Sequence, residues 1–146
     1  MTDNSGWIDP SFDGSFCRFP NPGDAYVGIV EAYDPEGGAQ NYNRDGEVGC
    51  LKLATADGPM LLALDRPNLR REVQRAMRRA EQNNLWGADA EPYSLMMLVR
   101  FVDWGGSGQK RYKAFKVLIR PATEDDQIEM STNLEPAYVD ELEAPF

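Results

Sequence analysis

One amphipathic segment constrains the fold of this chain more than any other feature of its sequence. Residues 65–84 are rich in arginine, and their apolar residues repeat at helical spacing on one face: Leu69, Val73, Ala76, Met77 and Ala80. Pro67 suits the first turn of a helix, and Gly87 follows the expected end. We therefore predict one helix here, with arginines covering the rest of its surface.

The segments on either side of this helix have the pattern of β-strands. Alternating or β-branched residues occupy 25–33, 47–55, 60–64, 93–104 and 111–120. The Asp57-Gly58 pair predicts a hairpin between the second and third strands, and the glycine-rich stretch 105–108 predicts another between the fourth and fifth. Residues 34–46 are polar and rich in turn formers, which predicts a long loop.

The resulting order is strand, strand, strand, helix, strand, strand. We predict a mainly β fold, a five-stranded OB-fold-like Greek-key barrel with its helix between strands 3 and 4. The same elements are compatible with an SH3-like barrel or an α+β roll. The two longest polar loops, 34–46 and 104–111, favour the OB-fold, because its loops after strand 1 and between strands 4 and 5 grip oligonucleotides.

Charge divides the chain into regions that the net charge of −9 conceals. Residues 61–121 hold twelve basic and six acidic side chains, whereas residues 122–146 hold eight acidic side chains and no basic one. We predict an N-terminal extension (1–24), an OB-fold domain (25–120) and a disordered acidic tail (121–146), since the tail has no periodic apolar pattern. The aromatic extension packs along the barrel or mediates self-association, and the sequence leaves both open.

Sequence-tolerant binding of a single strand needs cations along the phosphates and aromatic faces for the bases. Alternation in 93–104 puts Met97, Val99 and Phe101 inside and predicts Arg100 and Trp104 as neighbours on the outer face. The full predicted single-stranded-DNA surface comprises Tyr33, Lys52, Arg100, Trp104, Lys110, Arg111, Tyr112, Lys113 and Lys116.

Structural roles compete with several of these assignments. A tryptophan at the shoulder of a hairpin, such as Trp104, also suits packing at the end of a barrel. The arginine face of the helix is solvated, holds phosphate or holds the acidic tail of the chain itself, and the sequence does not separate these three.

The tail ends in an acidic run closed by proline and phenylalanine: Asp140, Glu141, Glu143, Pro145 and Phe146. A basic domain followed by such a tail resembles the bacterial and phage single-stranded-DNA-binding proteins, although Leu142 and Ala144 interrupt the acidic run. The resemblance implies that the tip docks on replication, recombination and repair proteins. Capture of a terminal carboxylate and its neighbouring ring is a known mode of recognition.

These observations together predict a sequence-tolerant single-stranded-DNA-binding protein that coats DNA and recruits partners through its tip. The sequence leaves open whether it assembles as a homo-oligomer. The alternative is a protein-interaction adaptor with an OB-like barrel and no significant DNA binding. An enzyme such as a small nuclease is not expected, because no paired carboxylates, phosphate loop or histidine mark a site. No cofactor or metal is expected either, since Cys17 and Cys50 lack metal-ligand spacing.

The location of the protein is also predicted from what the sequence lacks. Its longest apolar run is far shorter than a membrane span, and the acidic start does not have the pattern of a signal peptide. We therefore expect a cytoplasmic protein of a bacterium or of a phage-infected host cell.

Overall fold

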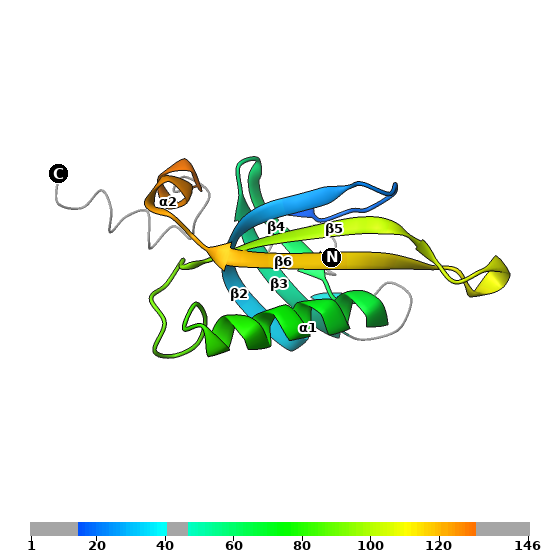
Figure 1. The fold of residues 1–146 in the computed structure, drawn as a ribbon, viewed down its shortest axis with the longest axis horizontal. Helices are drawn as coiled ribbons and strands as arrows, with labels where there is room; N and C mark the ends of the chain where they lie inside the picture. The colour runs from blue at the N-terminus through cyan, green and yellow to red at the C-terminus, as the bar shows by residue number, and fades with distance from the viewer. Residues whose placement is uncertain (1–14, 41–46, 131–146) are drawn as a thin grey trace, which may run out of the picture.

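The computed structural model describes residues 15–40 and 47–130, which form one sheet and two α-helices (Figure 1). The elements are β1 (Ser15–Phe16), β2 (Ala25–Gln40), β3 (Glu47–Thr55), β4 (Gly58–Ala63), α1 (Pro67–Gln82), β5 (Leu95–Gly105), a 3-10 turn (Gly108–Lys110), β6 (Tyr112–Pro121) and α2 (Glu124–Met130). The predicted mainly β class is confirmed. Neither helix in this part of the chain is long and apolar enough to cross a membrane.

The sheet has the strand order β1-β4-β3-β2-β5-β6. The neighbouring strands β4-β3, β3-β2, β2-β5 and β5-β6 pair in antiparallel, and the short β1 pairs with β4 in parallel. Strands β2, β3 and β4 are consecutive, and β5 returns after α1 to lie beside β2. This is the strand order that defines a Greek key.

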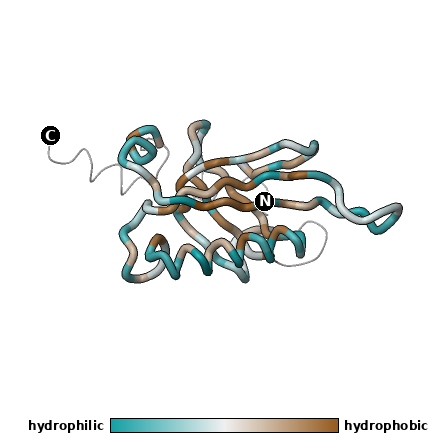
Figure 2. Tube along the Cα trace, in the orientation of Figure 1, coloured by the Kyte–Doolittle hydropathy of each residue, from teal (hydrophilic) through white to brown (hydrophobic). Residues whose placement is uncertain are grey.

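The core lies between one face of the sheet and α1. The buried face of α1 carries Leu69, Val73, Met77 and Ala80, which belong to the same apolar cluster as residues of every strand from β2 to β6. Figure 2 shows hydrophobic and hydrophilic stretches alternating along the coil of α1, as expected for a helix with one apolar face. Phe19, from the predicted N-terminal extension, joins this cluster through edge contacts with Tyr26 and Phe115 at 5.2 and 5.1 Å.

A closed barrel is not found in the described residues. The sheet ends at β1 on one side and at β6 on the other, and no strand pair joins the two edges. The helix occupies the space between them, because Leu69 and Val73 of α1 pack in one cluster with Leu62 of β4 and Phe115 of β6.

The predicted loop 34–46 is wrong in its first half. Strand β2 continues to Gln40 and pairs with β3 as far as Glu47, with register shifts between Val30 and Ala32 and between Asp34 and Gly38. Such bulges let polar and glycine residues stay within a strand pair, which the alternation rule does not anticipate. Residues 41–46 lie outside the described residues.

The predicted disorder of the tail is wrong for its first turns, because α2 begins at Glu124. The backbone N–H of Thr123 donates to Asp126, and the N–H of Asp126 donates to the hydroxyl of Thr123, at 2.8 and 3.1 Å. This reciprocal cap starts the helix. At the end of α2, the side chain of Met130 packs in one buried cluster with Ile29, Ala54 and Met96 on the sheet face opposite α1. Residues 131–146 lie outside the described residues.

Candidate nucleic-acid interface

The β5–β6 hairpin extends past the body of the protein, with its tip at the far end of the molecule from α2 (Figure 1). A register shift between Phe101 and Asp103 interrupts the pairing of its two strands. Beyond this bulge, Trp104 lies opposite Lys113 and meets the ring of Phe101 edge-on at 5.3 Å. The prediction that Trp104 neighbours Arg100 on the outer face is therefore wrong, since one extra residue moves every later side chain to the other face.

Two cations gather at the indole of Trp104. The guanidinium of Arg111 lies over the ring at 4.5 Å from its centroid, and the ammonium of Lys113 lies at 5.7 Å. Lys113 also lies 5.3 Å from the ring of Phe101 and donates a hydrogen bond of 2.5 Å to the carbonyl of Phe19. Trp104 remains 40% exposed, so these contacts leave part of its surface open.

A groove of about 460 Å³ separates this hairpin from the start of α1. Arg66 and Arg71 line it from the helix side, and Arg111, Tyr112 and Lys113 line it from the hairpin. Asp65 is the one carboxylate among its lining residues. Four cations facing one acid give the groove a positive potential, which favours a polyanion.

A second hollow, of about 340 Å³, continues the groove toward the N-terminal segment. It shares Asp65, Arg66 and Lys113 with the first hollow and adds Arg18 beside the apolar Phe19. The two hollows therefore form one basic groove, which we call the hairpin groove.

Lys113 lies among both cations and carboxylates. Burial lowers the pKa of its ammonium below the usual value, and the nearby guanidinium of Arg66 lowers it further, while Asp24 and Asp65 act in the opposite direction.

The ring of Tyr112, on β6, lies over the backbone of Gly105 on the paired strand β5. Tyr112 pairs with Gly105 across the hairpin, and a Cβ added to Gly105 would come within 2.5 Å of the Tyr112 ring. The glycine is needed because the ring occupies the space of a side chain. Tyr112 remains 52% exposed and provides a second aromatic surface at the hairpin groove.

The other predicted residues do not join this cluster. Arg100 and Lys116 are exposed and directly opposite each other on the sheet face that α2 partly covers, and Lys52 lies on the same face. Next to them, Val27, Leu98 and Leu118 form a row across three strands, with Val27 and Leu118 44% and 47% exposed. The predicted surface is therefore split between two faces of the sheet.

Tyr33 and Lys110 do not line the hairpin groove and are not part of the Arg100 and Lys116 pair. Tyr33 packs against the core, where burial, assisted by Glu81, raises the pKa of its phenol. Lys110 is exposed in the 3-10 turn at the hairpin tip, and its backbone N–H donates to Ser107 at 3.0 Å. The tip residues Asp140, Glu141, Glu143, Pro145 and Phe146 lie outside the described residues.

Sequence reasoning missed three basic residues of the hairpin groove: Arg18, Arg66 and Arg71. Arg71 was part of a helix face for which a solvated role stayed open, and Arg66 directly precedes the helix. A sequence signal did exist, because a basic residue at the start of a helix opposes the helix dipole and calls for an anionic neighbour. Arg18 had no such signal, since only the fold brings it near Lys113.

Among the described residues, no group of three or more acidic, cysteine or histidine side chains is placed to hold a metal ion. Comparison with protein-family models, with curated proteins and with solved structures finds no match to this chain.

Proposed function

We propose that this chain is a sequence-tolerant single-stranded-DNA-binding protein that coats and protects exposed strands during replication, recombination and repair. The observation that supports this most is the hairpin groove, which the exposed Tyr112 lines together with four cations, Arg66, Arg71, Arg111 and Lys113. Two of these cations, Arg111 and Lys113, also lie at the ring of the exposed Trp104. Cations for phosphates and ring faces for bases are the two requirements of such binding.

Binding exchanges one set of contacts for another. In the free protein the guanidinium of Arg111 covers one face of the Trp104 indole. A base that stacks on this ring displaces the guanidinium, which then pairs with the adjacent phosphate. Because every base has a π-face and every nucleotide a phosphate, the exchange requires no particular sequence.

We further propose that the open sheet is OB-like. Its Greek-key order, with α1 between β4 and β5, supports this assignment, and so does the position of the basic hairpin between the last two strands. The second OB-fold loop expected at DNA is that between β2 and β3, whose residues 41–46 lie outside the described residues.

The tip of the tail is proposed to have a separate role, the recruitment of partner proteins. We infer that Pro145 and Phe146, with the acids before them, bind replication, recombination or repair proteins, as the resemblance implies. Deleting these two residues should leave the affinity for oligo-dT unchanged, because the residues proposed to bind DNA all belong to the described part of the chain. A large loss of oligo-dT affinity on this deletion would contradict the separation of roles.

The assignment of the hairpin groove is tested by comparing two pairs of charge changes. The groove variant is Arg66→Gln with Arg111→Gln, and its control on the opposite sheet face is Arg100→Gln with Lys116→Gln. Fluorescence anisotropy of labelled oligo-dT should show reduced affinity for the groove variant and a salt slope smaller by about 1.4, at ~0.7 per lost phosphate contact. The control should match the wild type.

The reverse result, with loss only in the opposite-face variant, would move the binding surface to the face of Arg100 and Lys116. Equal affinity of both variants and the wild type would show that the hairpin groove does not bind oligo-dT.

A further inference from the structure

We propose that the bound strand continues from the hairpin groove along the arginine face of α1 and ends with a base in the pocket beside Trp86. This inference rests on the proposed function and adds a path to it. It assigns ligands to two features, the exposed helix face and a pocket at the far end of the helix.

The helix face begins inside the hairpin groove, because Arg71 lines the groove and belongs to α1. Arg75 and Arg78 follow Arg71 at spacings of four and three residues, so all three project from one side of the helix. This side is opposite the buried one, and all three side chains are exposed. The helix therefore presents about one cation per 5.4 Å turn, continuous with the groove.

Charge on this face is not balanced within the described residues. The ion pair found there joins Arg75 to Glu72 at 3.4 Å, and the Arg75 side chain in it is 68% exposed. Arg71 and Arg75 are neighbours of like charge at i and i+4, and so are Arg75 and Arg79, and such pairs destabilise a helix. A row of phosphates would convert this repulsion into attraction.

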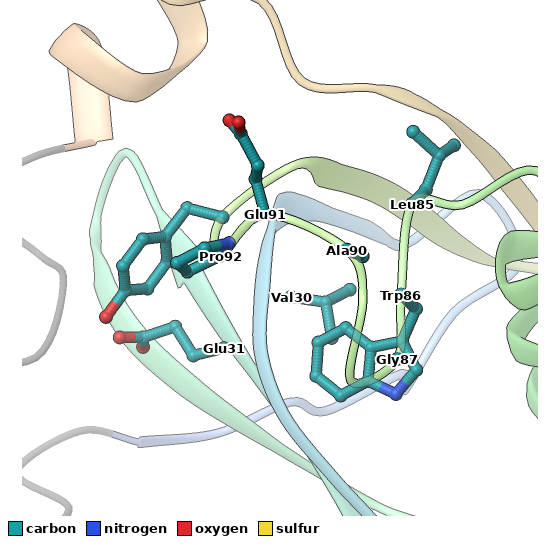
Figure 3. A pocket seen from close by; sticks show the side chains of 9 residues that line it. Val30, Glu31, Leu85, Trp86, Gly87, Ala90, Glu91 and Pro92 are labelled. Atoms are coloured by element: carbon teal, nitrogen blue, oxygen red, sulfur yellow. The ribbon is translucent and has the colours of Figure 1, made fainter.

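The far end of α1 leads to a pocket of about 380 Å³. Trp86, four residues after the last helical residue, lines it together with Val30, Leu85 and Pro92 (Figure 3). None of the lining residues is basic, and two of them, Glu31 and Glu91, are acidic. The pocket therefore repels phosphate and suits the uncharged, flat part of a nucleotide, its base.

The loop that forms this pocket has a defined backbone. Asn84 and Tyr93, at its two ends, have positive φ angles of 58° and 61°, which are uncommon for residues other than glycine. Trp86 also packs against the main core cluster. The pocket is thus shaped before any ligand arrives, as is usual for binding sites.

The dimensions fit a short strand. The 16 residues of α1 span about 24 Å, which corresponds to roughly seven nucleotides at the ~3.4 Å rise of a B-form strand and fewer if the strand is extended. A full-length site would then lie within the range of about 4 to 16 nucleotides that a single OB-type domain covers.

Single-tryptophan variants test this path. Trp7→Phe with Trp104→Phe leaves Trp86 as the reporter, and Trp7→Phe with Trp86→Phe leaves Trp104. Both are titrated with oligo-dT from about 4 to 30 nucleotides. Trp104 should respond to the short oligonucleotides, whereas Trp86 should respond only above a threshold length near 8 nucleotides.

Charge reversal on the helix provides a second test of the path. In the Trp86 reporter, Arg75→Glu with Arg78→Glu should abolish the response to long oligo-dT, whereas Arg100→Glu with Lys116→Glu should preserve it. In the Trp104 reporter, the helix variant should keep its response to short oligo-dT, which also shows that the variant is folded. Arg75→Gln with Arg78→Gln repeats the test without added negative charge.

The outcomes separate the path from the proposed function. If Trp104 responds to oligo-dT and Trp86 does not respond at any length, or if the helix variants leave the Trp86 response intact, the path is wrong and the proposed function stands. If neither tryptophan responds and anisotropy shows no binding, the proposed function fails, and the path fails with it.

Discussion

The guanidinium of Arg111 lies over the indole ring of Trp104, 4.5 Å from the ring centroid, at the exposed shoulder of the β5–β6 hairpin. The pair joins the two groups that binding of a single strand requires, a cation for phosphate and a ring for a base. It exists because the bulge after Phe101 turns Trp104 toward the basic side of the hairpin.

Replacing Trp104 by alanine should weaken oligo-dT binding by about 1 to 3 kcal/mol, or roughly 5- to 150-fold in Kd, because one base loses its stacking surface. Trp104→Phe should retain part of the affinity, since a smaller ring remains. Anisotropy titration of both variants against the wild type measures the effect. Equal binding by Trp104→Ala and the wild type would show that Trp104 serves packing alone.

A side chain at Gly105 should act through Tyr112. In Gly105→Val the new Cβ would lie within 2.5 Å of the Tyr112 ring, so the ring must leave its place at the hairpin groove. We expect oligo-dT affinity to fall about as far as in Tyr112→Ala. The double variant Gly105→Val with Tyr112→Ala should be no weaker than Tyr112→Ala alone. Additive losses in this double-mutant cycle would mean that Gly105 acts independently of Tyr112.

The docking of α2 on the sheet should resist acid. The guanidinium of Arg120 contacts both carboxylate oxygens of Asp126, at 2.6 and 3.2 Å, and this hydrogen bonding, with that of Thr123, holds the pKa of Asp126 well below its usual range. A lowered carboxyl pKa stabilises the folded form above the unfolded value of about 3.9, and this stability is lost only as pH falls through the lower, folded value.

Amide hydrogen exchange in residues 127–130 measures this docking. Protection in the wild type should be similar at pH 7 and near pH 4, whereas Asp126→Asn should lose it at both. Asp125→Asn, which changes an exposed neighbour, is the matched control. Loss of protection in the wild type already at pH 5 would contradict the role given to Arg120 and Asp126.

The thiol of Cys17 should be unreactive in the folded protein. Burial raises its pKa from 9.0 to about 12, so almost no reactive thiolate is present at pH 8. In a Cys50→Ser variant, alkylation of Cys17 by iodoacetamide should be slow in buffer and fast in urea, where the pKa returns toward its ordinary value. Similar rates in the two conditions would show that the segment around Cys17 does not pack on the core.

Hydrophobic pattern was sufficient for α1, for the strands from β3 to β6, for the first part of β2 and for most of the core, but it did not show β1, the end of β2 or α2. The expected inward residues Met97, Val99 and Phe101 are all buried, and the helix expected at 65–84 occurs at Pro67–Gln82. These features depend on local periodicity, which a sequence displays directly. The strand order also agrees with a Greek key, because two hairpins and one helical connection leave few alternatives.

Features that depend on single irregular residues were not predictable in this way. The bulge between Phe101 and Asp103 reverses the side on which Trp104 lies, and alternation carries no sign of it. Likewise, Arg18 reaches the hairpin groove only because the N-terminal segment packs along β4. The reciprocal cap of Thr123 and Asp126 was visible as a threonine followed three residues later by an acid, and the acidic composition of the tail obscured it.

The most direct test of the central claim is intrinsic tryptophan fluorescence of the wild type, titrated with oligo-dT of about 30 nucleotides and with a duplex of equal length at several salt concentrations. The account predicts strong quenching by the single strand alone, with an affinity that falls steeply as salt rises, because stacking and phosphate contacts act together. Equal responses to both DNAs, or no response at low salt with no shift in a gel, would contradict it and leave a protein-interaction adaptor as the better account of this chain.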